Sequence, residues 1–255
     1  MNIALIGYGK MGKMIEKLSQ NRNQPITARI ALDDSTADSD VISAETLQGA
    51  DVCIEFTHPD AAVDNIKKLA ALGKNIVVGT TGWYGSLDEV RAIVEKACVG
   101  LIYASNFSLG ANLFMHIAEG AAKLMNEFPD YDVGGFEGHH NQKADSPSGT
   151  AKTMAGIVLE NISRKTKAKY NAVEGVIDPH ELHIASVRCG HLPGTHSLFF
   201  DSADDTITLT HQMRRREGVA EGALHAAKWI QGKKGVYTIR DMMGDILNSK
   251  RKESR

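Results

Sequence analysis

The densest group of residues able to do acid–base chemistry lies at residues 137–151, which read E-G-H-H-N-Q-K-A-D-S-P-S-G-T-A. His139 and His140 follow a strand-like run, and because side chains alternate along a strand, only one of the two can face a given reacting centre. Imidazole titrates near neutral pH and suits proton transfer. Lys143 adds a cation that can bind a carboxylate or donate a proton. The group therefore predicts an acid–base site for an anionic substrate.

The second half of this group predicts the start of a helix. Ser148 would be the N-cap, and the backbone N–H groups of Gly149 and Thr150 would then lack partners within the helix. Such a helix end can hold an anion without a metal, although the same residues could serve only as a cap. Zinc ligation by His139 and His140 is an alternative, but neither an HExxH nor a CxxC pattern accompanies them, so we expect no metal.

A G-x-G-x-x-G loop lies between a strand-like run and a helical one, and its members are Gly7, Tyr8, Gly9, Lys10, Met11 and Gly12. In such a loop the first glycine permits a tight turn, the second lets the backbone approach a pyrophosphate, and the third lets the helix pack close to the sheet. The helix N-terminus offers N–H groups to the phosphates. We therefore predict that the loop binds a dinucleotide and is more than a structural turn.

The end of the next strand-like run carries acidic residues. Asp33 can accept hydrogen bonds from an adenosine ribose. Asp34 follows it without an accompanying arginine, so a 2′-phosphate would meet like charge; this favours NADH, with NADPH still possible. Two further loops follow predicted parallel strands, where doubly wound sheets bind ligands, although turn formation explains their residue types equally well. From these loops we expect as cofactor contacts Gly79, Thr80, Thr81, Ala104, Ser105, Asn106 and Phe107.

The pattern of predicted helices and strands that must position these residues changes near residue 107. Before it, strand and helix signals alternate, which is typical of an α/β fold with a Rossmann-type doubly wound parallel sheet. We predict strands at 3–6, 26–32, 52–56, 76–78 and 101–104, and helices at 11–18, 61–72 and 87–97. After it we predict helices at 112–128, 150–162 and 219–230, strands at 132–137, 184–188, 197–200, 206–210 and 235–237, and a last helix from residue 239.

These signals predict two domains. The first is a dinucleotide-binding domain at 1–107, to which we expect 216–255 to return, and the second is an α+β domain at 108–215 with a mostly antiparallel sheet. The alternation of apolar and polar residues at 206–210 favours a half-buried antiparallel strand.

The bulk composition excludes several classes of protein. The chain has 255 residues and a net charge of −2, so nothing points to nucleic acid or an anionic membrane as partner. No apolar stretch approaches the roughly 20 residues that span a bilayer, no signal peptide is visible, and three cysteines without a CxxC pair indicate no disulfide framework. We expect a cytoplasmic protein. The scattered histidines are expected to be ordinary surface or core residues: His180, His183, His191, His196 and His211.

The 137–151 group closely resembles the signature E-x-H-H-x-x-K-x-D-x-P-S-G-T-A of the 4-hydroxy-tetrahydrodipicolinate reductase (dihydrodipicolinate reductase) family of diaminopimelate–lysine biosynthesis. Four further segments resemble family segments in the same order, and the resemblance covers essentially the whole chain: 56–59, 79–82, 106–108 and 240–242. The glycine loop departs from the family pattern, being one residue shorter, with Lys10 where arginine is usual.

The resemblance implies a Rossmann domain joined to an α+β domain that binds substrate and forms a homotetramer. It implies hydride transfer from NADH or NADPH to a small dicarboxylate. By match, His139 would be the proton donor or acceptor and Lys143 the second proton donor. The substrate would be held by His140, Ser148, Gly149 and Thr150.

Two other functions remain open from the residues alone. One is an NAD-linked dehydrogenase of another amino-acid-derived acid, such as an aspartate-type dehydrogenase. The other is a non-catalytic module that senses NAD(H), although a sensor has no need of the proton donors His139 and Lys143 beside an anion cradle.

Overall fold

The computed structural model describes residues 1–32 and 34–253, with side chains up to residue 247. It divides into two compact units, which are called unit 1 and unit 2 below. Unit 1 comprises Met1–Leu109 and Glu217–Arg255, and unit 2 comprises Gly110–Arg216. From the sequence we expected the domain boundaries between residues 107 and 108 and between residues 215 and 216. No helix in the described part of the chain is long and apolar enough to cross a bilayer.

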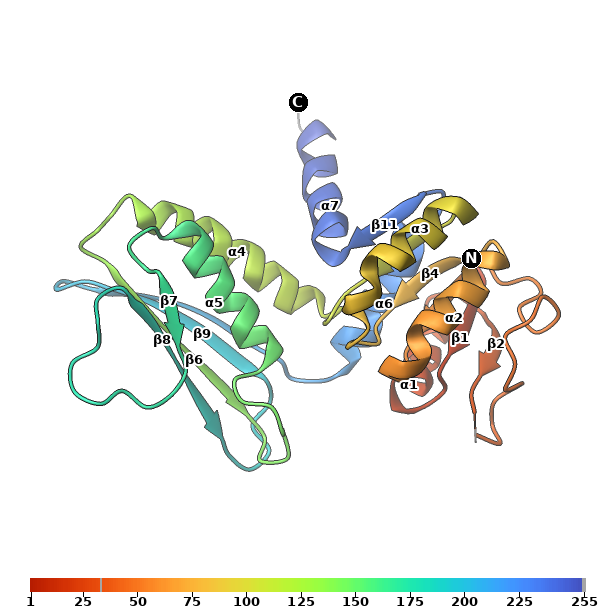
Figure 1. Cartoon of the computed structure of the whole chain (residues 1–255), viewed down its shortest axis with the longest axis horizontal. Helices are drawn as coiled ribbons and strands as arrows, with labels where there is room; N and C mark the ends of the chain where they lie inside the picture. Colours follow the sequence, from red (N-terminus) through yellow and green to blue (C-terminus); the bar gives the residue numbers. More distant parts are fainter. Residues whose placement is uncertain (33, 254–255) are drawn as a thin grey trace. The chain divides into compact units, whose positions relative to one another are not determined.

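Unit 1 contains a six-stranded, fully parallel sheet in the order β11-β5-β4-β3-β1-β2 (Figure 1). Its strands are β1 (Ile3–Ile6), β2 (Ile26–Ile30), β3 (Val52–Glu55), β4 (Asn75–Val78), β5 (Gly100–Tyr103) and β11 (Gly235–Thr238). All four residues of β1 and all four of β3 are buried, as expected for central strands covered on both faces. The predicted Rossmann-type sheet is confirmed.

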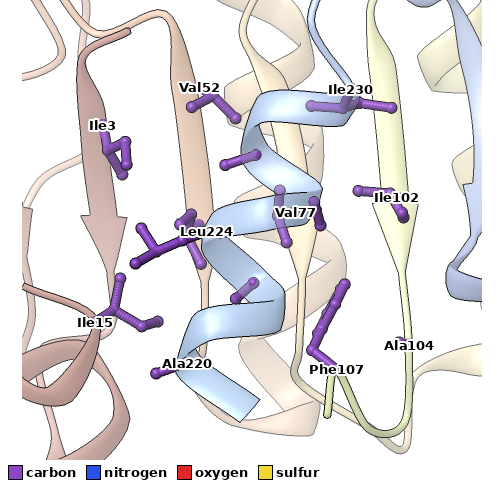
Figure 2. Packing of buried hydrophobic residues seen from close by; sticks show 14 of the residues in the cluster. Ile3, Ile15, Val52, Val77, Ile102, Ala104, Phe107, Ala220, Leu224 and Ile230 are labelled. Carbon is purple, nitrogen blue, oxygen red and sulfur yellow. The ribbon is translucent and has the colours of Figure 1, made fainter. Parts of the chain in front are cut away.

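Helices cover both faces of this sheet. They are α1 (Lys10–Gln20), α2 (Pro59–Ala71), α3 (Leu87–Ala97), α6 (Glu217–Trp229) and α7 (Ile239–Glu253), with a short 3₁₀ helix at Tyr84–Ser86. One hydrophobic cluster joins the sheet to α1, α6 and α7, and a second joins it to α2 and α3. Figure 2 shows Leu224 of α6 and Ile230 just after it packed over the strands that carry Val52, Val77 and Ile102.

Unit 2 contains a five-stranded mixed sheet in the order β10-β9-β6-β8-β7. Its strands are β6 (Asp132–His139), β7 (Lys167–Lys169), β8 (Glu181–Arg188), β9 (Thr195–Asp201) and β10 (Thr206–Gln212). The β10–β9 and β9–β6 pairs are antiparallel, whereas the β6–β8 and β8–β7 pairs are parallel. The expectation of a mostly antiparallel sheet was therefore wrong. Alternation along one strand reports a half-buried face and says nothing about the direction of its neighbours.

The helices α4 (Leu109–Asn126) and α5 (Gly149–Asn161) lie on one face of this sheet (Figure 1). Their apolar residues pack with those of β8 and β9, with Met154, Leu198 and Phe200 almost fully buried. Strand β7 was not predicted from the sequence, because Lys-Ala-Lys has no apolar run and lies at the sheet edge.

Candidate active site

Close contacts require glycine at two positions of the loop after β1, Gly7 and Gly12. Gly7 has a φ of +94°, and a Cβ there would lie 2.0 Å from the carbonyl oxygen of Phe56, in the loop after β3. A Cβ on Gly12 would lie 2.4 Å from the carbonyl oxygen of Gly7. The loop after β1 thus packs tightly against the start of α1 and against the loop after β3. This is the topological switch point of the sheet, where doubly wound folds bind ligands.

The outer side of the same loop is open. A Cβ on Gly9 would meet no heavy atom within 4 Å, and Gly9 is the N-cap of α1 without a side-chain cap. No group in the described part of the chain accepts a hydrogen bond from the backbone N–H of Lys10, Met11 or Gly12. Free N–H groups at a helix N-terminus, beside a position with room for a phosphate, fit a dinucleotide.

The loops after β4 and β5 lie at the same edge of the sheet. The Thr57 N–H donates to the Thr80 hydroxyl over 2.7 Å, and the Ala104 N–H donates to the carbonyl of Val78. Thr80, Ala104 and Phe107 are buried, whereas Thr81 and Ser105 are exposed. Gly79 and Asn106 are half-buried. The structure therefore brings these predicted residues to the carboxyl ends of neighbouring strands.

Charged residues surround the end of β2. The Asp34 carboxylate lies 2.9 Å from the Lys13 ammonium. Hydrogen bonds from Thr36 and from Lys13 lower the pKa of Asp34 to about 2. Arg29 pairs with Glu16 and with Asp38. The predicted ribose contact, Asp33, lies outside the described residues.

The Tyr8 side chain contacts the same group of charged residues. Its hydroxyl donates to Glu16, and its ring lies below the Lys13 ammonium and the Arg29 guanidinium. Tyr8 is thereby buried, although its neighbour Gly9 is exposed.

In unit 2, strand register gathers ionisable side chains on the face that α5 covers. Glu137 of β6 lies opposite Ser186 of β8 and His196 of β9. Two residues further along the same face, His139 lies opposite Arg188. Because successive side chains alternate, all five project to the same side of the sheet.

Glu137 is the fully buried centre of this cluster. Its Oε1 accepts hydrogen bonds from the Ser148 N–H at 3.0 Å, the Ser186 hydroxyl at 2.8 Å and the Arg188 guanidinium at 2.8 Å. Burial opposes ionisation, but the bonds from Ser148, Arg188 and Ser186 overcome it and lower the pKa of Glu137 to about 2. The cluster therefore contains a permanent buried anion at neutral pH.

The other oxygen of Glu137 faces two imidazoles. Its Oε2 lies 3.3 Å from His139 Nδ1 and 3.6 Å from His196 Nε2. Burial lowers the pKa of His139, the Glu137 charge opposes this shift, and Lys143 and Arg188 add to it. His139 is therefore mainly neutral at pH 7, and the Glu137 carboxylate favours a proton on its Nδ1.

The start of α5 has the predicted form. Ser148 is the N-cap, and its hydroxyl oxygen accepts the Ala151 N–H at 3.1 Å. Among residues 1–32 and 34–253, no group accepts a hydrogen bond from the N–H of Gly149 or Thr150. Gly149 is exposed.

The remaining predicted residues lie in the loop between β6 and α5. The Lys143 ammonium pairs with the Asp145 carboxylate at 2.6 Å, and Lys143 lowers the pKa of Asp145. His140 is half-buried, next to His139 at the strand end. No role was predicted from the sequence for Glu137, Arg188 or His196, because their proximity depends on strand register.

Three donor groups of the cluster also come within metal-binding distance of one another. The ligand atoms of Glu137, His139 and His196 all lie within 4.8 Å. The Arg188 guanidinium, which already occupies Glu137 Oε1, opposes the binding of a further cation. The arrangement therefore suits proton chemistry better than metal chemistry.

The fold and these two groups of residues define a class: a Rossmann-type oxidoreductase whose dinucleotide-binding unit is joined to a unit with a buried acid–base cluster. Comparison with known protein families agrees with this class of enzyme. Residues 1–107 match the model of the dihydrodipicolinate reductase N-terminus, and residues 110–243 match that of the dihydrodipicolinate reductase C-terminus. The chain belongs to the dihydrodipicolinate reductase family.

Full-length relatives carry the same family name. The chain is 39% identical over 249 residues to the 4-hydroxy-tetrahydrodipicolinate reductase of Christiangramia forsetii, covering 98% of this chain and 100% of that protein. It is 36% identical to that of Neisseria gonorrhoeae, covering 96% and 97%. A dipicolinate-bound dihydrodipicolinate reductase from Paenisporosarcina sp. TG-14 superimposes with a TM-score of 0.77 at 25% identity, covering 93% of this chain and 97% of that one.

Proposed function

We propose that this enzyme reduces 4-hydroxy-tetrahydrodipicolinate to tetrahydrodipicolinate with NAD(P)H, in the diaminopimelate–lysine pathway. The observation that carries the proposal is the acid–base cluster around Glu137 and His139, beside the free N–H groups of Gly149 and Thr150. A substrate with two carboxylates needs both a cation and N–H donors, and this part of unit 2 supplies both. Family membership agrees with this assignment.

Loss of the 4-hydroxyl group as water first converts the substrate to a conjugated imine, dihydrodipicolinate. The bound dinucleotide, held by Gly7–Gly12 and by the loops after β4 and β5, would then supply a hydride to this imine. Its addition leaves a carbanion-like centre that must take a proton. In this proposal His139 donates or accepts the proton. Glu137 Oε2 lies 3.3 Å from its Nδ1 without a hydrogen bond between the two atoms, and the negative charge of Glu137 stabilises the imidazolium form. Lys143 is the second proton donor, and it exchanges its pairing with Asp145 for the substrate.

Substrate binding is assigned to the start of α5. The N–H groups of Gly149 and Thr150 and the hydroxyl of Ser148 bind a carboxylate, and His140 contributes from the strand end. The name of the Paenisporosarcina structure supports this substrate class, since dipicolinate is a planar dicarboxylate of similar shape.

We propose that NADH is the preferred cofactor within the NAD(P)H specificity of the family. The cations near the end of β2 are already paired, Lys13 with Asp34 and Arg29 with Glu16 and Asp38. A 2′-phosphate would have to displace one of these carboxylates, which costs free energy that NADH does not require. Asp33 is proposed as the ribose contact on sequence grounds.

We also propose a cytoplasmic homotetramer with unit 2 as the substrate-binding and oligomerisation domain. The cytoplasmic location and the tetrameric assembly both rest on the family resemblance. Analytical ultracentrifugation tests the assembly, and a monomer at micromolar concentration would contradict it.

A coupled assay tests the reaction itself. Freshly generated pathway precursor is supplied with NADH and, in parallel, with NADPH, and the loss of reduced-cofactor absorbance is followed. We expect turnover with both and a higher kcat/KM with NADH. Oxidation of aspartate without reduction of the precursor would instead identify an aspartate-type dehydrogenase.

A further inference from the structure

One buried histidine near the start of α5 has no part in the function proposed so far. His196, on strand β9 between β10 and β6, is 4% exposed. Its Nε2 lies 3.2 Å from the Ser148 hydroxyl oxygen and 3.6 Å from Glu137 Oε2. Its ring contacts that of His139 edge to face, with centroids 5.2 Å apart.

The surroundings of His196 determine where its proton resides. Nδ1 is buried and has no hydrogen-bond partner among the described residues, whereas Nε2 faces a hydroxyl and a carboxylate oxygen. A buried N–H without an acceptor costs more than a buried lone pair without a donor, so the proton belongs on Nε2. Burial and the neighbouring His139 lower the pKa of His196 to about 4, so the ring stays neutral at pH 7.

This tautomer decides what the Ser148 hydroxyl can do. Its oxygen then accepts two hydrogen bonds, from the Ala151 N–H and from His196 Nε2. Both lone pairs are used, and the hydroxyl proton remains for a further acceptor. With the proton on Nδ1 instead, Nε2 would accept the hydroxyl proton and remove it from the binding site.

We infer that His196 is a positioning residue of the active site, which keeps the Ser148 hydroxyl available as a donor to a substrate carboxylate. The inference rests on the proposed function for its substrate. A metal site formed by Glu137, His139 and His196 is the competing interpretation, and the test below separates the two.

The test compares three variants with the wild-type enzyme. His196→Phe keeps an aromatic ring but removes the N–H donor, and His196→Gln keeps an N–H donor of similar reach. His211→Phe is the matched control, because His211 is a half-buried histidine directly opposite His196 on β10 but packs against Phe114. Each variant is first checked for a native circular-dichroism spectrum.

We expect His196→Phe to raise the KM for the precursor and the Kd for dipicolinate about 10- to 100-fold, since one hydrogen bond to a charged group is lost. The KM for NADH should stay unchanged, His196→Gln should recover most of the loss, and His211→Phe should resemble wild type. Because His196 acts through Ser148, adding His196→Phe to Ser148→Ala should cost little more.

Three results would overturn the inference. The first is an unchanged dipicolinate Kd in His196→Phe, and the second is the same loss in the Ser148→Ala background as in wild type. The third is stoichiometric zinc in the purified enzyme that His196→Phe abolishes. If the wild-type enzyme fails to reduce the precursor, the proposed function fails, and calorimetric dipicolinate binding still decides the role of His196.

Discussion

The two groups of candidate site residues, one in each unit, consist of different chemical groups. In unit 1 the loop at Gly7–Gly12 offers backbone N–H groups, and its shape depends on the absence of side chains. In unit 2 the cluster around Glu137 consists of side chains from three strands and a helix cap. The first kind of site is local in the sequence, whereas the second exists only once the strands have paired.

The two groups of residues also differ in how they respond to pH. A backbone cradle carries no titratable group, so its affinity for phosphate should change little with pH between 5 and 8. The cluster in unit 2 holds a carboxylate with a pKa of about 2 against an imidazole with a pKa of about 4. Because both of these pKa values lie below 5, we expect acidification through pH 4 to act on unit 2, and far less on cofactor binding.

The largest expected effect comes from removing the proposed proton donors, His139 and Lys143. His139→Ala and Lys143→Ala should each lower kcat about 10²- to 10⁴-fold, the range for a positioned acid–base group, while NADH binding is kept. Steady-state kinetics measures kcat, and NADH fluorescence measures NADH binding. The matched control is Lys123→Ala, an exposed lysine of α4 paired with Glu119. Unchanged kcat in both His139→Ala and Lys143→Ala would refute the acid–base roles.

The second effect is on stability in acid. His196 has a folded-state pKa of about 4, below the usual 6.5, so folding favours its neutral form. Its contribution is complete above pH 6.5 and is lost as pH falls through 4, at most about 3 kcal/mol. Thermal unfolding between pH 7 and 4 should therefore show a shallower loss of Tm in His196→Gln than in wild type. The exposed His191 gives the control His191→Gln, and equal slopes in all three proteins would contradict the prediction.

A third prediction isolates the backbone cradle. A Cβ on Gly9 or on Gly156 would meet no heavy atom within 4 Å, so neither Gly→Ala change creates a clash within the protein. Gly156→Ala in α5 should stabilise by about 0.5–1 kcal/mol and leave NADH binding unchanged. Gly9→Ala should weaken NADH binding about tenfold, because the methyl group occupies the space beside the free N–H groups. Equal NADH affinities in the two variants would argue against the cradle.

The smallest expected effect concerns cofactor choice. Asp34→Ala frees the Lys13 ammonium and removes a carboxylate, so the ratio of kcat/KM for NADPH over NADH should rise about fivefold, a small effect as expected for an exposed charge pair. Asp64→Ala removes an exposed carboxylate paired with Lys67 on α2 and serves as control. An unchanged ratio in Asp34→Ala would remove the charge argument for NADH.

Much of the fold could be predicted from the sequence. The strand at 3–6 and the helix at 87–97 were predicted with their observed bounds, because apolar runs and helical spacing are local signals. The mixed pairing of the second sheet could not be predicted. The parallel β6–β8 pair depends on a crossover through α5, and no residue pattern within either strand records it.

The candidate site divides in the same way. Gly7, Gly9 and Gly12 could be picked out from the sequence, because they lie in one short loop between a strand and a helix, and the placement of Ser148 as N-cap is confirmed. His196 was taken for an ordinary histidine, because 57 residues of chain separate it from His139. Only the antiparallel register of β9 with β6 brings its ring beside Glu137.

The most direct test of the account follows hydrogen isotopes into the product. NADH deuterated at nicotinamide C4 is used in ordinary water, and unlabelled NADH is used in deuterium oxide, each with freshly generated precursor. We expect one cofactor-derived deuterium in the first product and one solvent-derived deuterium on the neighbouring carbon in the second, as hydride addition followed by protonation requires. A reduced product without cofactor-derived deuterium, or no product at all, would contradict the account.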